Sequence, residues 1–423
     1  MQLKKQPTSI RAALAAATCT LLAQPLVAAA QGSSTDEDDW DVQSGLLFYD
    51  ETDRIQVIEP VITASKTLEN GDLLTLRGVI DTITGASPNG ATPTDTAQTF
   101  TSPSGDIDTT AAGETPMRST QDMRRAFDAE WEMELSRMVR NTLSGSISNE
   151  EDFLSLSIAD TVKLDLNKRH TTLAAGFAMT MDTISVEGGT PIELELLSAP
   201  APVSTDDDGM HKNSVELLLG VTQIIDRKTL TQLNYSVSHS SGYLTDPYKF
   251  LSVIEPVTGN TLDYRYEKRP DSRTSHILNW RLNHQFNEDV IYLGYRYFMD
   301  DWGINAHTAD IKYRSELGNG RYLQPHLRFY QQTAADFFRH SLVEGDPLPT
   351  HASSDLRLGE MTGRTIGVKF GMPLAGGDFT VRIEQMVQEG ESSPADAIGI
   401  QQNYDLYPTL TANIIQFGYR FLF

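Results

Sequence analysis

The sequence predicts an all-β fold, a closed antiparallel transmembrane β-barrel of about 16 strands with long extracellular loops and short periplasmic turns. Three observations favour this fold: the alternation of apolar and polar residues in the last segment, the order of long and short connections, and a secretion signal at the start. Only alternate residues of a barrel strand face lipid, so a crossing strand needs no continuous apolar run.

Residues 1–30 have the form of a cleaved signal peptide. Lys4, Lys5 and Arg11 make a basic start, residues 12–22 are apolar, and three alanines at 28–30 provide a small-residue cleavage site. The single cysteine, Cys19, would leave with this segment, so the mature chain is expected to have neither a disulfide nor a thiolate metal site. Residues 31–43 are expected to be an acidic flexible leader, and residues 44–423 to form the barrel.

Strands are expected where short alternating segments are bounded by turn residues. The third strand follows Asn70-Gly71, a turn dipeptide, and the eighth and ninth form a hairpin across residues 226–228. Residues 126–138 could equally be a short helix. The first nine expected strands are residues 44–50, 54–65, 72–84, 122–135, 137–148, 152–166, 170–186, 213–225 and 229–240.

The remaining seven strands show clearer alternation, and they are expected at residues 274–286, 289–301, 305–317, 321–334, 360–373, 378–389 and 411–423. In the last of these, Phe417, Tyr419, Phe421 and Phe423 share one face while Arg420 lies on the other. A chain that stops on phenylalanine at the end of such a strand is typical of bacterial outer-membrane barrels. The alternative is a buried edge strand in a soluble sandwich.

The connections favour the barrel over the sandwich. Every even-numbered connection is a short turn, and all five long connections fall at odd positions: residues 85–121, 187–212, 241–271, 335–358 and 390–410. If both termini are periplasmic, every long connection is extracellular, as in bacterial barrels. Closure also removes the unpaired strand edges that lipid would not tolerate.

Composition alone resembles that of an acidic soluble protein. The 423 residues are 39% hydrophobic, and the mean hydropathy is -0.32. The formal net charge is -23, and removal of residues 1–30, with three basic and no acidic residues, changes it to -23 - 3 = -26. This balance disfavours nucleic acid as a partner.

Alternation assigns a basic inner wall to the last seven strands. Asp310, Glu316 and Glu384 are the acidic residues expected on the same wall. One interpretation is a plug of salt bridges that fills the barrel, and the other is an anion-favouring passage or a seat for a phosphate-bearing ligand. The expected basic residues of the lumen are Arg281, Arg296, Lys312, Arg314, Arg328, Lys369, Arg382 and Arg420.

Neither a metal site nor an enzymatic activity is expected. Histidines are concentrated in the second half of the chain, without tight ligand spacing, and His276 and His284 are expected to mark the two rims of the lipid face. Zinc-protease, nucleophile-elbow and phosphate-loop motifs do not occur in the sequence.

Several segments together resemble the DUF3570 family, a domain of unknown function, over essentially the whole mature chain. These segments are residues 81–90 (DTITGASPNG), 239–249 (HSSGYLTDPYK), 269–273 (RPDSR), 300–308 (DDWGINAHT) and 322–330 (YLQPHLRFY). The resemblance implies a bacterial outer-membrane protein without an established activity. It also implies genes nearby for a small lipoprotein, a thioredoxin-like protein and an FAD:protein FMN transferase.

That transferase adds a cofactor hypothesis. Its acceptor pattern resembles D-x-x-[ST]-G-A-[ST], and residues 81–87 read D-T-I-T-G-A-S. The resemblance implies covalent FMN on Ser87, with Asp81 and Thr84 as polar neighbours and Gly85 and Ala86 keeping the hydroxyl accessible. The alternative is a strand end that runs into a turn.

Three functions follow as hypotheses for this outer-membrane protein of a Gram-negative bacterium. They are a flavin-carrying redox barrel of the envelope, a porin or transporter for a small anionic solute, and a structural barrel that anchors the lipoprotein. The expected partners are outer-membrane lipid, the barrel assembly machinery, and, by resemblance, the lipoprotein and the FMN transferase.

Overall fold

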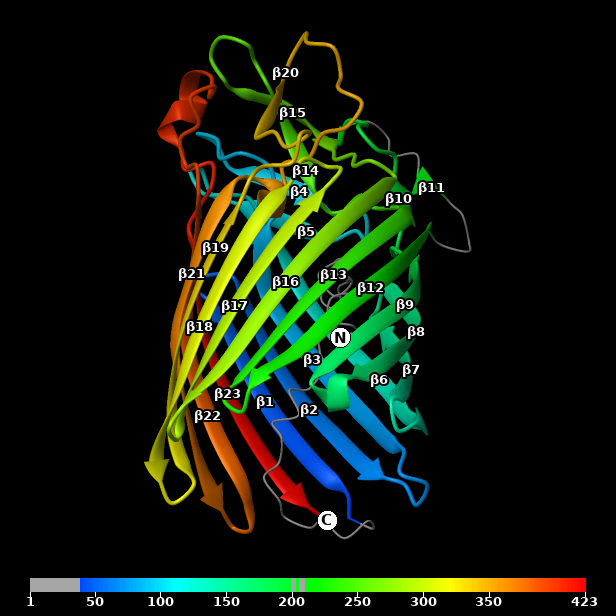
Figure 1. Cartoon of the computed structure of the whole chain (residues 1–423). Helices are drawn as coiled ribbons and strands as arrows, with labels where there is room; N and C mark the ends of the chain where they lie inside the picture. Colours follow the sequence, from blue (N-terminus) through cyan, green and yellow to red (C-terminus); the bar gives the residue numbers. More distant parts are fainter. Residues whose placement is uncertain (1–38, 199–202, 205–209) are drawn as a thin grey trace, which may run out of the picture.

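The computed structural model describes residues 39–198, 203–204 and 210–423. Sixteen antiparallel strands close into one barrel, in the order β1-β2-β3-β6-β7-β8-β9-β12-β13-β16-β17-β18-β19-β21-β22-β23 (Figure 1). The first eight are β1 Asp41–Glu51, β2 Ile55–Thr67, β3 Leu73–Pro88, β6 Met117–Ser136, β7 Val139–Asn149, β8 Phe153–Leu166, β9 Thr171–Ile184 and β12 Met210–Asp226. The other eight are β13 Thr229–Gly242, β16 Ser272–Phe286, β17 Asp289–Asp300, β18 Asn305–Gly318, β19 Arg321–Gln332, β21 Met361–Leu374, β22 Gly377–Gly390 and β23 Leu410–Leu422.

The predicted fold is confirmed, because each expected strand corresponds to one barrel strand in the expected order. The last strand, β23, pairs with β1 in an antiparallel ladder that runs from Ala412 opposite Glu51 to Leu422 opposite Asp41. β1 begins at Asp41, three residues before the strand expected at residue 44. The expected signal peptide and most of the acidic leader fall in residues 1–38, outside the described residues.

The hairpin of β3 and β6 is longer than the sequence indicated. Its ladder continues to the pair Pro88 and Met117, so residues 85–88 and 117–121 are strand, although a loop was expected there. The helix alternative for residues 126–138 is wrong, since residues 126–136 belong to β6. Buried and exposed side chains still alternate in the added residues 118–121. Pairing between the two strands therefore continues the β-ladder to Pro88 and Met117.

Short turns join the strands at one end of the barrel, called the turn end, where the C-terminus also lies (Figure 1). Asn287 and Asn319 adopt φ values of 52° and 55° in two of these turns. Asparagine tolerates this left-handed conformation, which suits tight hairpins. The expected short turn at every even-numbered connection is therefore confirmed.

The five long connections lie at the opposite end, called the loop end, and some of them form small β-sheets with one another or within themselves. They contain the pair β4 Gln98–Thr101 and β5 Ile107–Thr110, the short pair β10 Thr190–Pro191 and β11 Val203–Ser204, and a sheet ordered β15-β14-β20. In that sheet, β14 Phe250–Ile254 and β15 Thr261–Tyr266 come from residues 243–271, and β20 Ser341–Val343 comes from residues 333–360. We call residues 243–271 and 333–360 together the cap; Figure 1 shows its sheet above the barrel wall.

The outer surface of the barrel is apolar. Ile62, Leu217, Leu327 and Ile383 are 52–54% exposed on the outside of their strands. Among the described residues, no helix is long and apolar enough to cross a membrane. The only helical turns in this part of the chain are the short η1 Asn167–Arg169, η2 Leu356–Leu358 and η3 Gly399–Asn403.

Candidate functional site

The eight basic residues expected in the lumen all lie at inward positions of their strands. Arg296 pairs with Asn279 on β16 and Thr308 on β18, while its sequence neighbour Tyr295 is 39% exposed on the outside. Arg328 likewise lies between the outward Leu327 and Phe329. The outward face is marked by exposed aliphatic and aromatic side chains, so alternation places the intervening basic residues inside.

Half of these basic residues are in ion pairs. Arg314 also stacks on Tyr322, with its guanidinium carbon 3.8 Å from the ring centroid. The shortest nitrogen–oxygen distances are 3.3 Å for Lys312 and Asp310, 2.5 Å for Arg314 and Glu316, 3.7 Å for Arg382 and Glu384, and 2.7 Å for Arg420 and Asp41.

The other half, Arg281, Arg296, Arg328 and Lys369, make no ion pair with any residue that the structure describes. The Nε atom of Arg296 has no hydrogen-bond acceptor there either, and its guanidinium carbon lies 5.5 Å from the centroid of Phe298. Arg328 is exposed although it points inward, so solvent-accessible space borders it inside the barrel. The basic wall therefore carries positive charge that the protein does not neutralise.

His326 belongs to the same wall, at the inward position that the alternation of its strand indicates. Its Nε2 lies 2.7 Å from Asp310 Oδ2, and its Nδ1 lies 2.8 Å from Glu384 Oε1. A protonated imidazole can donate one hydrogen bond to each carboxylate. The two acidic residues are thus held by His326, Lys312 and Arg382, which leaves the unpaired arginines as the dominant charge.

The facing wall is acidic, and sequence reasoning missed it because only the last seven strands were assigned inner and outer faces. Asp81 forms an ion pair with Arg124, and the carboxyl group of Glu59 contacts Asp81. Glu59 and Glu130 on this wall have no basic partner in an ion pair among residues 39–198, 203–204 and 210–423. The alternation of inward and outward residues that predicted the basic wall also predicts the inward positions of these acidic residues.

The two walls lie across the lumen from each other. In the ring of sixteen strands, β3 is third and β17 eleventh, while β2 is second and β16 tenth; each pair is eight strands apart, half the circumference. Glu59, Arg296 and Arg328 each lie four residues from the loop end of their strands. Acidic side chains on one wall and basic side chains on the other can create a field across the lumen, perpendicular to its axis.

The residues of the flavin hypothesis all lie within β3, which ends at Pro88, one residue after Ser87. Asp81 and Ser87 face inward opposite Arg124 and Arg118, whereas Thr84 and Ala86 lie on the outward face. Gly85 has φ of +120°, and a Cβ there would lie 2.1 Å from the backbone oxygen of Arg54. Glycine at this position therefore serves a close backbone approach between β2 and β3.

The cap is seated directly above these inward residues. Arg118 lies over the ring of Tyr248, with 3.4 Å between the guanidinium carbon and the centroid. The phenolic O–H of Tyr248 donates to Asp152 at 2.7 Å, and the Lys249 ammonium group donates to the backbone oxygen of Pro88. These contacts attach residues 243–271 to β3, to β6 and to the connection before β8.

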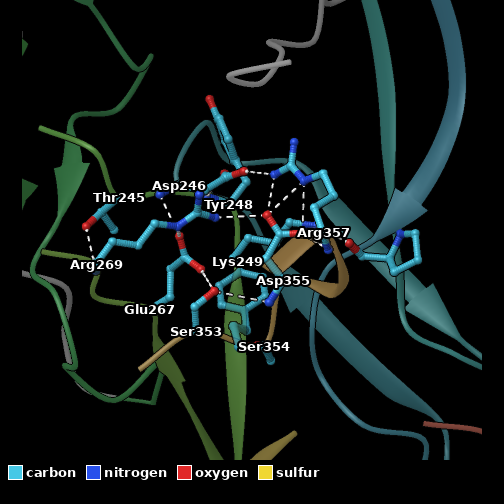
Figure 2. A network of polar contacts seen from close by, with 12 residues as sticks. Thr245, Asp246, Tyr248, Lys249, Glu267, Arg269, Ser353, Ser354, Asp355 and Arg357 are labelled. Carbon is cyan, nitrogen blue, oxygen red and sulfur yellow. Dashed lines mark hydrogen bonds and ion pairs between the residues drawn. The ribbon is translucent and has the colours of Figure 1, made fainter. Parts of the chain in front are cut away.

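A buried ionic network joins the two halves of the cap (Figure 2). Arg269 Nε donates to Glu267 at 2.6 Å, and its Nη2 donates to Asp355 at 2.9 Å. Arg357 Nε donates to both oxygens of Asp355, at 2.9 and 2.8 Å, and its Nη2 donates to Asp246 at 3.1 Å. Glu267 also accepts from the backbone N–H of Asp246 at 2.7 Å.

Burial acts differently on the two central carboxyl groups. It raises the pKa of Glu267, despite the nearby charge of Arg269. Burial also opposes the ionisation of Asp355, but Arg357, Lys249 and Arg269 outweigh it and hold the pKa of Asp355 well below its usual range. Such a satisfied network fixes the relative position of loops more than it adds net stability.

No group of three or more histidine, cysteine, aspartate or glutamate side chains in the described residues is arranged to hold a metal ion. The interior of the barrel is instead defined by its two charged walls and the cap. This arrangement can orient and select charged solutes, and its unpaired guanidinium groups can bind carboxylate, sulfonate or phosphate oxygens.

Comparison with protein families finds one match, to the family described as "Protein of unknown function (DUF3570)", over residues 11–421. No curated protein matches the chain. Similar solved structures include Pseudomonas aeruginosa OccK5 (OpdH), with 7% identity over 91% of this chain and 98% of that chain and a TM-score of 0.42. Another is the ferric enterobactin receptor PfeA of the same organism, with 9% identity over 91% of this chain and 59% of that chain and a TM-score of 0.42.

Proposed function

We propose that this chain, which belongs to the DUF3570 family, is an outer-membrane barrel that passes small solutes bearing an anionic group. The observation that carries the proposal is the set of inward basic side chains without a protein counter-ion, Arg281, Arg296, Arg328 and Lys369. A lumen lined by basic side chains favours anions.

The membrane location rests on closure, surface and connections. A closed barrel satisfies all backbone groups between neighbouring strands, as a bilayer requires. Its outer face is apolar, and its connections are long at one end only. Bacterial barrels place long loops outside the cell and short turns in the periplasm, so the loop end and its cap are assigned to the extracellular side.

The cap supports a restriction to small solutes. Its residues Leu251, Ser252, Glu267, Ala352 and Ser353 are fully buried, so the loops form a folded layer. That layer also contacts the upper edge of the basic wall, because the Gln332 amide donates to the backbone oxygens of Arg357 and Gly359 at 2.9 and 2.7 Å. A solute that enters from outside must pass this layer before it meets Arg296 and Arg328.

The experiment is uptake of radiolabelled isethionate, a small sulfonate, into liposomes that contain the purified protein. The wild type is expected to admit isethionate several-fold faster than protein-free liposomes. The double variant Arg296→Gln and Arg328→Gln is expected to lose most of that uptake. The matched control is Arg364→Gln, an exposed arginine on the outward face of β21, opposite Phe329; it should behave as wild type.

Two results would contradict the proposal: no uptake by the wild type, or equal uptake by the double variant. A colourless barrel that admits no solute and co-purifies with a small lipoprotein would instead favour an anchoring role.

Covalent FMN on Ser87 is a second candidate function, linked to envelope electron transfer. The supporting observation is that Ser87 and Asp81 share the inward face of β3, and that Ser87 lies opposite Arg118. Intact-mass measurement of protein from its native host tests it. An FMN increment that Ser87→Ala removes would support attachment, whereas an unmodified mass in the presence of an active transferase would exclude it.

A further inference from the structure

We infer that the preferred solutes of this barrel are zwitterions, which carry an ammonium group as well as an anionic group. The inference rests on the proposed function and deepens it by naming the class of solute. It comes from the acidic wall, which the passage of an anion does not explain.

The lumen carries ionisable side chains of both signs without an ion-pair partner, on opposite sides. Glu59 and Glu130 have no ion-pair partner among the described residues, and they lie on β2 and β6. The unpaired basic side chains lie on β16, β17, β19 and β21. The protein builds ion pairs elsewhere on both walls, such as Lys163 with Glu132 at 2.9 Å on the acidic wall and Lys312 with Asp310 at 3.3 Å on the basic wall. The inward side chains without an ion-pair partner therefore differ from their neighbours on the same walls, which form ion pairs.

A second observation concerns Asp81. This residue is 5% exposed, and although its Oδ2 pairs with Arg124, its Oδ1 has no hydrogen-bond donor among the described residues. Glu59, which is half-buried, contacts Asp81 with its own carboxyl group. Two carboxyl groups in contact must share a proton or a neighbouring cation, because two adjacent negative charges repel. An ammonium group that reaches Glu59 supplies both the charge and hydrogen-bond donors.

The wall arrangement discriminates among solute charges. An anion without a cationic group is attracted by Arg296 and Arg328 but repelled by Glu59 and Glu130 across the lumen. A cation meets the reverse arrangement. A zwitterion can turn its anionic end toward the basic wall and its ammonium end toward the acidic wall, so both walls stabilise it.

The test compares taurine with isethionate, two sulfonates of nearly equal size in which an ammonium group replaces a hydroxyl group. Both are taken up into liposomes containing the full-length mature protein, and ethanolamine serves as the cation without an anionic group. Taurine is expected to enter about fivefold faster than isethionate. This ratio corresponds to about 1 kcal/mol, the attraction between one pair of opposite charges in close contact in water. Ethanolamine is expected to be slowest.

The variant that tests the acidic wall is Glu59→Gln combined with Glu130→Gln. Its taurine and isethionate rates should converge. The matched control is Asp160→Asn, on the outward face of β8 opposite Leu143 and Phe177; it should retain the taurine preference. Heat-modifiable gel mobility checks that each variant forms the barrel. If Glu59→Gln combined with Glu130→Gln does not fold, Glu59→Gln alone replaces it, with a partial loss of preference expected.

The outcomes separate the two proposals. If isethionate enters through Arg296 and Arg328 but taurine is no faster, the zwitterion inference is wrong while the proposed function stands. A taurine preference that survives neutralisation of Glu59 and Glu130 also overturns the inference. If neither sulfonate enters faster than in protein-free liposomes, the proposed function and the inference fail together.

Discussion

The ion pair between Arg269 Nη2 and Asp355 Oδ2, 2.9 Å apart, joins two loops whose contacting residues are 86 positions apart in the sequence. Both side chains are buried. The pair therefore connects the loop after β13 to the loop after β19, and it keeps the two halves of the cap together above the lumen.

Replacement of Arg269 by methionine is expected to destabilise the cap. The change leaves Glu267 and Asp355 with fewer compensating charges in a buried site, and removal of one partner from such a pair costs about 3–5 kcal/mol. Limited proteolysis of the protein in detergent should show earlier cleavage within residues 243–271 and 333–360, while the barrel strands stay intact. Arg339→Gln, an exposed arginine of the same cap, is the control. Equal protease resistance of Arg269→Met and wild type would show that the network does not hold the cap.

Glu150, in the connection between β7 and β8, should make stability depend on pH. Burial, followed by the charge of Asp122, raises its pKa from 4.5 to about 8. Between these values the folded state retains a proton that the unfolded state releases, so the free energy of unfolding should fall as pH rises from about 4.5 to about 8 and then level off.

Denaturant unfolding at several pH values measures this effect. Glu150→Gln should flatten the decline and, at pH 8, should raise the free energy of unfolding by about 1–2 kcal/mol. A decline of unchanged slope in Glu150→Gln would assign the pH dependence to other groups.

His326 should control the charge of the basic wall. Its replacement by leucine removes the contacts to Asp310 and Glu384 and leaves two carboxylates less compensated beside the unpaired arginines. Isethionate uptake is expected to fall about threefold or more, since each added negative charge opposes anion entry. His326→Gln, which can still donate a hydrogen bond, should lose less. Uptake that is unaffected by His326→Leu would place the selective region elsewhere.

Gly85 offers a test of the structural interpretation of the DTITGAS segment. Alanine at this position would combine a φ of +120° with a Cβ 2.1 Å from the Arg54 backbone oxygen. Strained backbone of this kind costs about 1–3 kcal/mol, so Gly85→Ala should lower the denaturant midpoint of purified, unmodified protein. Ala86→Ser, on the outward face of the same strand, should have little effect. Unchanged stability of Gly85→Ala would remove the structural reason for glycine here.

Much of the barrel could be predicted because its determinants are local. Strand alternation, the Asn70-Gly71 turn and the order of short and long connections each depend on a few neighbouring residues. The basic inner positions followed from the same alternation, as Arg296 and Arg328 illustrate, and so would the acidic positions of Glu59 and Glu130 had the early strands been assigned faces.

The cap could not be predicted in this way. Its sheet pairs Ser252 of β14 with Ser341 of β20, and its ionic network brings Arg269 to Asp355; neither pairing has a periodic signal. The extension of β3 to Pro88 was missed for a related reason, because residues 85–88 contain turn-forming types and are held as strand by the partner β6. Ion pairing was also not accessible from sequence, so the division of the basic wall into paired and unpaired residues required the structure.

The most direct test of the proposed anion-passing lumen is the reversal potential of the purified protein in a planar bilayer under a potassium chloride gradient. Wild type is predicted to give a reversal potential of the sign that denotes chloride selectivity. The variant with Arg281→Gln, Arg296→Gln and Arg328→Gln is predicted to shift it toward potassium selectivity, because the acidic wall then dominates. A potassium-selective wild type, or a reversal potential that the triple variant leaves unchanged, would contradict the account.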